Sequence, residues 1–495
     1  MIVVVGHGLV NGPYSRTTPR VIARRAGAPM AVNEEVTTRS TTAKPATKLV
    51  YPSRKELDSN MDWKSQWYPV GSTRTLKKNV PNPIRLLENA LVAWQSPSGW
   101  KVAVDRCPHR GAPLSYGRLE ANSTLTCSYH GWQFDAEGQT TYVPTKSKVG
   151  CSACLRVHPA VVCEHGLLWV WPQACVPGSP AEAAALAKPL PTDHLPPPGA
   201  VITDWTVNRV PVPWASLLEN TLDDAHGVHA HHGFAGLDRV VARPAFSTRS
   251  GERGHTDSFE AWVDVSGPMV GSDGSADPSD PNTWVNSYHF RAPHRTTVRF
   301  GPSYRAEGFI VPAAYDETLL VSAAFSVPEP GRGAHFIKSM QQANPFLTAV
   351  LHRLGTTVVC QDAVLAEADG LDNLRGERWT GERAKGGLTD SDGAVIRLRT
   401  WMRRTGGPPL MPASDDVKRW KVRRELSVWE MHTRDCPTCR RAHDDSAATA
   451  KVLLAFSIAA AASGLLPAAL ALLLNSEISR QTSRWFETYD VKFDR

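Results

Sequence analysis

Residues 107–132 read CPHRGAPLSYGRLEANSTLTCSYHGW. The stretch contains two mixed pairs of metal-binding side chains, Cys107-x-His109 and Cys127-x-x-His130, with seventeen residues between them. A structural zinc site also accepts two Cys and two His, but its familiar spacings keep two to four residues between paired thiolates. A [2Fe–2S] cluster in which two His replace two Cys on one iron takes one Cys and one His from each of two loops. The mixed pairing therefore favours the cluster.

The residues around both pairs favour tight loops on a small β-sheet. Pro108 lies within the first pair, Gly111 follows it and Gly131 follows the second pair, so backbone N–H groups can point at cluster sulfurs. Two strand-like runs, ALVAW at 90–94 and WKVAV at 100–104, precede the first loop. The stretch resembles a Rieske domain, with Cys107, His109, Cys127 and His130 as the cluster ligands.

Length and charge limit the possible classes of protein. A chain of 495 residues predicts about three folded units, and 42% apolar residues are enough to build real cores. Residues 1–48 contain seven of the basic residues and only Glu34 and Glu35 as acids, so about +2 of the net charge of +7 remains for the rest. This argues against a nucleic-acid surface. The first 33 residues have four Arg, no acid and scattered Ser and Thr, so we expect a transit peptide over residues 1–48, with an ordinary disordered tail as the alternative.

Composition also predicts where the domains end. Residues 176–200 contain seven prolines and read as a linker that closes the first folded unit. We therefore expect a Rieske domain over 63–176, a proline-rich linker over 177–200 and a second domain over 201–440. Residues 267–284 are rich in Gly, Ser, Asp and Pro and predict an exposed loop inside that second domain.

A second histidine-rich stretch, ENTLDDAHGVHAHHGF at 219–234, lies in the predicted second domain. His226 and His231 can reach one metal if the helix distorts or ends between them. A mononuclear iron that binds O2 uses two His and one carboxylate and leaves other positions open. Asp362 is the candidate carboxylate, because an acid in an apolar, helix-like run is costly unless it is paired or bound to metal. An N-cap role for Asp362 and a merely exposed His-rich helix are the alternatives.

The order of these motifs resembles the Rieske non-haem iron oxygenases over roughly residues 63–440. Asn220, Asp223, His226 and His231 match the family motif N-x-x-D-x-x-H-x-x-x-x-H residue by residue. The resemblance selects His231 over its neighbours and implies an α+β fold, in which an all-β Rieske domain precedes a catalytic domain with a central antiparallel sheet. It also implies that Asp223 links the cluster to the mononuclear iron across a subunit boundary, within the homotrimer expected for the family.

The C-terminal region adds two further features. Cys436-x-x-Cys439 predicts a dithiol with thiol-dependent regulation, favoured by the basic neighbours Arg434, Arg440 and Arg441. A four-thiolate zinc site with Cys151 and Cys154 is the alternative. Residues 452–474 carry no charge for twenty-three residues, which predicts a membrane helix that Pro467 kinks, with a bent span, a short re-entrant element or a buried core helix as alternatives.

Together these features resemble the plant and algal Rieske oxygenases that include pheophorbide a oxygenase. The resemblance implies a monooxygenase that takes electrons from reduced ferredoxin, uses O2 and opens a chlorophyll-derived tetrapyrrole at a chloroplast membrane, either the inner envelope or the thylakoid. The alternatives are an electron relay in a protein-import translocon and an oxygenase of protochlorophyllide or of a linear chlorophyll catabolite.

Overall fold

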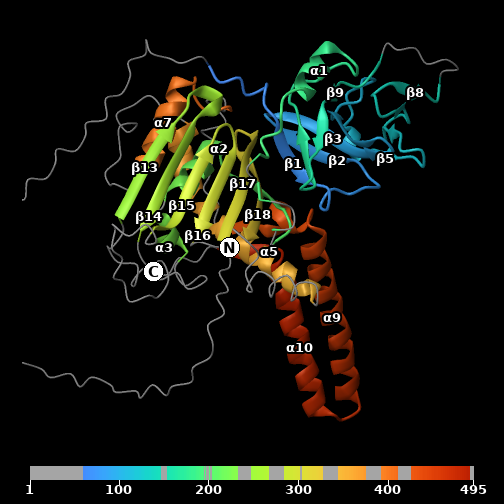
Figure 1. Ribbon diagram of the computed structural model, residues 1–495. Helices are drawn as coiled ribbons and strands as arrows, with labels where there is room; N and C mark the ends of the chain where they lie inside the picture. The colour runs from blue at the N-terminus through green and yellow to red at the C-terminus, as the bar shows by residue number, and fades with distance from the viewer. Residues whose placement is uncertain are drawn as a thin grey trace, which may run out of the picture. The chain divides into compact units, whose positions relative to one another are not determined.

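The computed structural model describes residues 60–490, apart from 146–152, 194, 197–199, 201–202, 224, 232–246, 267–283, 301–303, 327–343, 375–391 and 411–424. The predicted transit peptide lies outside the described residues, and so does the predicted loop at 267–284 apart from Trp284, which begins strand β15 (Trp284–Arg291). The element order confirms the α+β class: a β-rich N-terminal part, a large antiparallel sheet with helices, and C-terminal helices (Figure 1).

The N-terminal part consists of three small sheets. Their orders are β1-β11-β10, β2-β3-β4-β9 and β5-β6-β7-β8, and every pair is antiparallel. The two runs expected to form strands lie within β3 and β4. The strands are β1 Tyr68–Ser72, β2 Asn82–Leu86, β3 Asn89–Ser96, β4 Gly99–Val104, β5 Arg118–Leu119, β6 Leu125–Thr126, β7 Gln133–Phe134, β8 Thr140–Tyr142, β9 Val157–His158, β10 Ala160–Val162 and β11 Leu167–Val170.

A seven-stranded antiparallel sheet forms the frame of the second part. Its order is β12-β18-β17-β16-β15-β14-β13, so six strands follow one another as a meander and β12 closes one edge. The strands are β12 Thr206–Val210, β13 Ser247–Arg253, β14 Glu260–Ser266, β15 Trp284–Arg291, β16 Arg295–Phe300, β17 Tyr304–Ala314 and β18 Glu317–Ser326.

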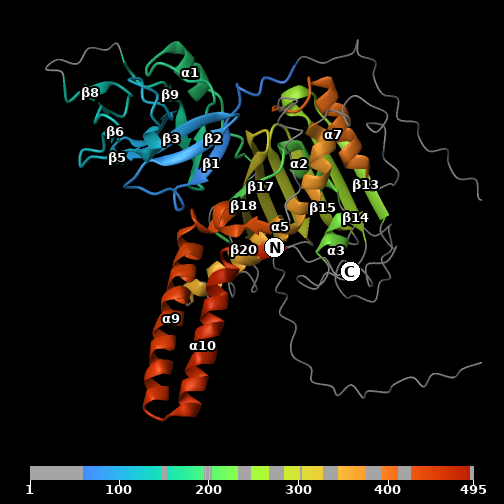
Figure 2. The same ribbon diagram turned by 180° about the vertical axis from the view of Figure 1, so that it is seen from behind.

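The two faces of this sheet bury different cores, because successive side chains of a strand point to opposite faces. On β17, Ile310 faces a core shared with helices α2 (Trp214–Leu222), α5 (Pro345–Leu374) and α7 (Gly393–Arg404). Its neighbour Phe309 faces the other core, where its ring meets that of Trp169 of β11 at 5.1 Å. Figure 2 shows α2 and α7 on one face of the sheet.

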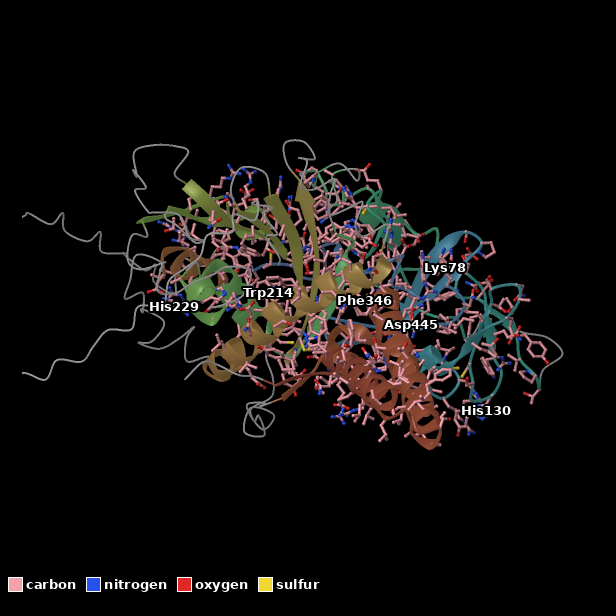
Figure 3. All side chains as sticks on the ribbon, turned by 90° about the horizontal axis from the view of Figure 1, so that it is seen from below. Lys78, His130, Trp214, His229, Phe346 and Asp445 are labelled. Atoms are coloured by element: carbon pink, nitrogen blue, oxygen red, sulfur yellow. The ribbon has the colours of Figure 1, made fainter. Side chains whose placement is uncertain are left out.

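Helix α2 is held against its surroundings by buried polar contacts. Trp214, labelled in Figure 3, donates through Nε1 to the carbonyl of Ile310 at 2.7 Å. Near the other end, Glu219 accepts two hydrogen bonds from Arg399 of α7, at 3.0 and 2.6 Å. Such a buried charged pair fixes geometry, since removing one partner leaves the other charge uncompensated. The end of α2, where Asp223 lies, is therefore well defined.

The stretch 177–200, predicted as a linker, contains a helix. Helix α1 runs Pro180–Leu186, and Ser179 caps it by accepting from the backbone N–H of Glu182. Proline at the first helical position suits a helix start, which is why a proline-rich composition did not exclude one here. Leu190 and Leu195 pack against the core around Trp169, so much of the stretch is bound to the fold rather than free.

The predicted membrane helix at 452–474 is two helices rather than one. Helix α9 (Pro437–Ala462) and helix α10 (Leu466–Trp485) form an antiparallel hairpin (Figure 1). The chain reverses at Gly464, whose positive φ of 77° is accessible to glycine, and Pro467 lies in the first turn of the second helix instead of kinking one. Ser457 Oγ donates to the carbonyl of Ala469 at 2.7 Å and joins the two helices.

After the hairpin the chain returns to the part built on the seven-stranded sheet. Strand β20 (Thr488–Asp490) pairs with β19 (Glu425–Ser427), which precedes a short π-helix, η7 (Trp429–Thr433). Buried Arg353 of α5 donates to the carbonyl of Thr488 at 3.2 Å and lies over the ring of Trp485. The C-terminal segment is thus fastened to helix α5.

Candidate metal centres

The two loops that carry the first Cys/His pairs have the same backbone geometry. In one, Cys107 N–H donates to the carbonyl of Ala112 and Gly111 N–H donates back to Cys107. In the other, Cys127 N–H donates to the carbonyl of Trp132 and Gly131 N–H donates back to Cys127. Both glycines have positive φ, 74° and 68°, as expected for tight loops.

These loops bury the thiols and leave the imidazoles near the surface. Cys107 and Cys127 are almost fully buried, whereas the ring of His109 is exposed and lies 4.6 Å from that of His130. His109 also stacks on Trp132, which limits its rotation. Backbone N–H groups of His109 and Arg110 bond the Cys107 sulfur, as the sequence predicted for a cluster.

The chemistry of this donor set fits a [2Fe–2S] cluster. Burial, reinforced by the neighbouring Cys127 thiol, raises the pKa of Cys107 to about 11. Two adjacent buried thiols of this kind are unfavourable as thiolates without a cation to compensate them. Two thiols on the inside and two imidazoles on the outside match a cluster with one sulfur-bound and one nitrogen-bound iron.

The second centre forms where α3 (His226–Ala230) meets α5. His226 begins α3, His231 directly follows it, and Asp362 lies in the middle of α5. One ligand atom from each of the three residues lies within 4.8 Å of the other two. Asp362 Oδ1 is 3.4 Å from His226 Nε2 and 3.1 Å from His231 Nε2. The sequence predictions for these three residues thus converge on one point, whereas His229 is exposed and His232 lies outside the described residues.

The orientation of both rings is fixed by acceptors on their far side. His226 donates through Nδ1 to the carbonyl of Asp223 at 2.5 Å, and His231 donates through Nδ1 to Gln361 Oε1 at 2.9 Å. Because Nδ1 is the donor in each ring, Nε2 is the atom left to bind a metal ion or a second proton, and it faces Asp362. Asp362 Oδ1 is buried and makes no hydrogen bond within the described structure.

The two Nε2 atoms and Asp362 Oδ1 need a positive charge among them, from a proton on a ring or from a metal ion. Burial lowers the pKa of His226, but Asp362 and Asp223 outweigh it and raise that pKa to about 9. Burial raises the pKa of Asp362, yet the two rings hold it well below its usual range. Two imidazole nitrogens and one carboxylate are the facial set typical of non-haem iron. The residues present therefore fit a mononuclear iron.

Asp223 lies between α2 and α3, at the position that joins the two helices. Its Oδ1 accepts from the backbone N–H groups of Ala225 and His226, at 3.0 and 3.4 Å, and so begins α3. Its carbonyl holds His226, as described above. The predicted link from Asp223 to a cluster in a neighbouring subunit stays a prediction, since one chain is described.

Two residues of this centre carry no motif in the sequence. Gln361 orients His231, and its side chain is also hydrogen-bonded to Tyr489 of β20. The only sequence feature that points to Gln361 is its place beside Asp362. Because glutamine beside an acidic residue is common in helices, its role could not be predicted. Tyr489 lies more than a hundred residues after Gln361 in the sequence. The two meet only because the chain comes back to α5 after the hairpin.

The C-terminal cysteines lie apart from both centres. Cys436 and Cys439 are buried beside His352 and His432, while Cys154 bonds Gln139 of the N-terminal part and Cys151 lies outside the described residues. Arg434 pairs with Glu430 and Asp435 instead of facing the thiols. The predicted thiol regulation stays a prediction.

The uncharged run 452–474 forms the end of the hairpin around its turn, here called the hairpin tip. Its apolar side chains are largely exposed. Of the described helices, α9 is the one long and apolar enough to cross a membrane, and 11% of its most apolar window is buried. Exposed side chains include Phe456, Ile458, Leu466, Leu470 and Leu474.

Comparison with known proteins agrees with this geometry. The family model described as "Rieske [2Fe-2S] domain" matches residues 66–158. Pheophorbide a oxygenase of Oryza sativa subsp. japonica is 26% identical over 465 residues, covering 84% of this chain and 80% of that protein. Flavonoid 8-hydroxylase 2 of Ocimum basilicum is 26% identical over 463 residues, covering 88% and 83%. Pheophorbide a oxygenase of Arabidopsis thaliana is 36% identical over 214 residues, covering 41% and 38%. All three relatives are described as chloroplastic.

Proposed function

We infer that this chain, which belongs to the Rieske non-haem iron oxygenases, is a ferredoxin-dependent monooxygenase that acts on a chlorophyll-derived tetrapyrrole, with pheophorbide a as the first candidate. The observation that carries the oxygenase assignment is the convergence of His226, His231 and Asp362 on one point. An electron relay has no need of such a site, because a relay does not bind O2.

The substrate class is supported by similarity and by the exposed hairpin. The rice pheophorbide a oxygenase matches most of both chains. A lipid-soluble macrocycle also gives a reason for an exposed apolar hairpin, because membrane attachment places the site near its substrate. The basil flavonoid hydroxylase matches a similar share, so a flavonoid belongs in the substrate panel.

The residues of the chain have separate roles in this proposal. Cys107, His109, Cys127 and His130 hold the [2Fe–2S] cluster, and His226, His231 and Asp362 hold the mononuclear iron. When bound, these groups supply one-electron transfer and O2 activation. Gln361 and the Asp223 carbonyl orient the rings, and the Asp223 carboxylate links the two centres between subunits of a homotrimer.

Location and attachment follow the same reasoning. We place the chain at a chloroplast membrane, inner envelope or thylakoid, with the arginine-rich N-terminus as its transit peptide. The hairpin tip rises about 15 Å from Val452 to its turn, at ~1.5 Å per residue, against a hydrocarbon core of about 30 Å. Although α9 as a whole is long enough to cross a membrane, its uncharged part matches the depth of one leaflet, so we propose that the hairpin enters one leaflet.

The decisive experiment combines turnover with isotope labelling. Anaerobically purified full-length chain with reduced ferredoxin and ¹⁸O2 is given pheophorbide a, protochlorophyllide, a linear chlorophyll catabolite or a flavonoid. We expect a ring-opened product of pheophorbide a that carries one labelled oxygen atom. Product from the flavonoid alone would overturn the tetrapyrrole assignment.

The site assignment is tested by Asp362→Asn in the same assay. We expect loss of substrate-dependent O2 uptake while the low-temperature resonance of the reduced Rieske cluster is retained. Asp445→Asn removes an exposed carboxylate of α9 and is the matched control (Figure 3). Unchanged O2 uptake in Asp362→Asn would remove this residue from the iron site.

A further inference from the structure

Four buried side chains meet at the base of the hairpin, separate from the two centres above. They are His352, His432, Cys436 and Cys439, and one donor atom from each lies within 4.8 Å of the other three. None of the four is more than 5% exposed. They come from three elements, α5, η7 and the start of α9, so the fold and not local sequence brings them together.

The start of α9 presents both thiols to the same point. Cys436 is the residue before the helix, Pro437 begins it and Cys439 lies in its first turn. Two cysteines with two residues between them are the spacing typical of paired zinc ligands. The side chain of Cys439 is fully buried, next to the core formed by Ala349 and Phe486.

The ring of His432 is oriented toward these sulfurs. Its Nδ1 donates to the carbonyl of Val207 at 3.0 Å, so its Nε2 carries the lone pair. That Nε2 lies 3.3 Å from Cys439 Sγ. A ligating histidine whose other nitrogen donates to a backbone carbonyl is the usual arrangement at metal sites. The π-helix η7 supplies this orientation, and such turns often occur at functional sites.

His352 completes the set from helix α5. Its Nδ1 lies 3.4 Å from Cys436 Sγ. In a tetrahedral zinc site with Zn–S of about 2.3 Å and Zn–N of about 2.0 Å, neighbouring N and S atoms are roughly 3.5 Å apart. Both N···S distances in the structure are close to that edge length.

We propose that His352, His432, Cys436 and Cys439 bind one Zn²⁺ ion in a closed, structural site. Two thiolates offset the charge of the ion, and four protein ligands leave no open position for substrate. The cluster shares no ligand with the proposed iron centre and its existence does not depend on the oxygenase assignment.

Burial distinguishes this site from an exchanging dithiol. A dithiol that reacts with an external thiol needs solvent access, whereas Cys436 is 3% exposed and Cys439 is not exposed. Each sulfur instead has an imidazole nitrogen as a close neighbour, His352 Nδ1 for Cys436 and His432 Nε2 for Cys439. The groups that face the thiols are therefore imidazoles, as in a two-Cys, two-His zinc site.

The proposed ion has a mechanical consequence. It joins the first turn of the hairpin to α5, the helix that carries Asp362, and to η7. Thr433 of η7 also donates to the carbonyl of Phe486 at 2.7 Å, where the chain leaves the hairpin. Zinc at this point fixes both ends of the hairpin to the catalytic part.

The test measures zinc in the intact, full-length protein and in four variants. Cys436→Ser, Cys439→Ser, His352→Ala and His432→Ala each remove one ligand. We expect wild-type protein to hold one more equivalent of zinc than each variant, by mass spectrometry of the metals. Because zinc can also enter an iron site, the difference between variants is the readout rather than the total. Cys360→Ala removes a buried thiol that lies on α5 and outside the cluster, so this variant should keep the zinc.

Cobalt substitution separates ligand loss from misfolding. Co²⁺ bound by thiolates gives sulfur-to-metal charge-transfer absorption, which the His226, His231 and Asp362 site cannot produce because it has no sulfur. We expect this absorption in wild type and in Cys360→Ala, and its loss in Cys439→Ser with the Rieske resonance retained. Wild-type protein without thiolate-bound metal, with both thiols freely titratable or joined in a disulfide, would overturn the proposal.

Discussion

His231 donates a hydrogen bond to Gln361, the residue that directly precedes Asp362 on helix α5. Two consecutive residues of α5 therefore serve the same site. Asp362 is a candidate ligand, and Gln361 orients the ring of the candidate ligand His231. The outer contact fixes the tautomer of His231, and loss of such contacts commonly weakens metal binding about 10–100-fold. We expect Gln361→Leu to weaken Fe²⁺ binding by that factor in anaerobic titrations.

The conservative replacement Gln361→Glu keeps an acceptor for His231 and should retain most of the affinity. His229→Ala removes an exposed histidine of α3 and is the control. Equal Fe²⁺ affinity in Gln361→Leu and wild type would show that His231 needs no acceptor.

Asp223 has a structural and a proposed electronic role, and one substitution separates them. Asp223→Asn keeps an oxygen that can accept from the backbone N–H of Ala225, so α3 should still form. It removes the carboxylate charge through which Asp223 is proposed to link the two centres. We expect unchanged iron content and a turnover rate lower by about 10–100-fold. Stopped-flow absorbance of cluster oxidation with substrate and O2 reports this step, and wild-type oxidation rates would contradict the role.

The exposed tip of the hairpin predicts membrane attachment. Ile458→Glu and Leu470→Glu place a charge on side chains that are 64% and 66% exposed. A charge in the hydrocarbon costs about 2.5–3.5 kcal/mol at its centre, so the double variant should remain with the soluble fraction when vesicles of chloroplast lipids are floated. Val176→Glu alters a residue that is 72% exposed elsewhere and should float like wild type. Equal flotation of all three proteins would argue against the hairpin as the anchor.

His294 predicts a loss of stability in acid. Burial lowers its pKa to about 4, Nε2 donates to the carbonyl of Trp67 at 2.6 Å, and Nδ1 has no partner within the described structure. The unfolded chain binds a proton here below about pH 6.5, but the folded chain does so only near pH 4. The free energy of unfolding should therefore fall between those values, by about 3 kcal/mol from this group.

Denaturant unfolding at pH 7, 5.5 and 4.5 measures this effect. His294→Gln cannot take up the proton, so its unfolding free energy should decline less steeply over the same range. Parallel pH profiles for the two proteins would show that other groups dominate acid unfolding.

The sequence predicted the features that depend on local pattern. The glycines at 111 and 131 and the mixed Cys/His pairs indicate two similar loops, because turn geometry and ligand chemistry are encoded within a few residues. The apolar run around Asp362 indicates a helix, and α5 is one. The likeness of 219–234 to a family motif was needed to choose His231, since spacing alone left several histidines open.

Features that depend on long-range return of the chain were not predictable. His352 and His432 are single histidines without a motif, and only the packing of α5 against η7 and α9 brings them to the thiols. The turn at Gly464 was hidden inside a continuous apolar run, although glycine followed by Pro467 is a signal for a helix end and a new start. Ser179 followed by Pro180 is likewise a helix-start signal, and α1 begins there. The many prolines around it favoured the prediction of a linker instead.

Helix α5 carries both His352 of the proposed zinc site and Asp362 of the proposed iron site. The two residues lie ten positions apart, which is about 15 Å along the helix. Under the two proposals above, a displacement of the hairpin would act on the same helix that positions the iron ligand.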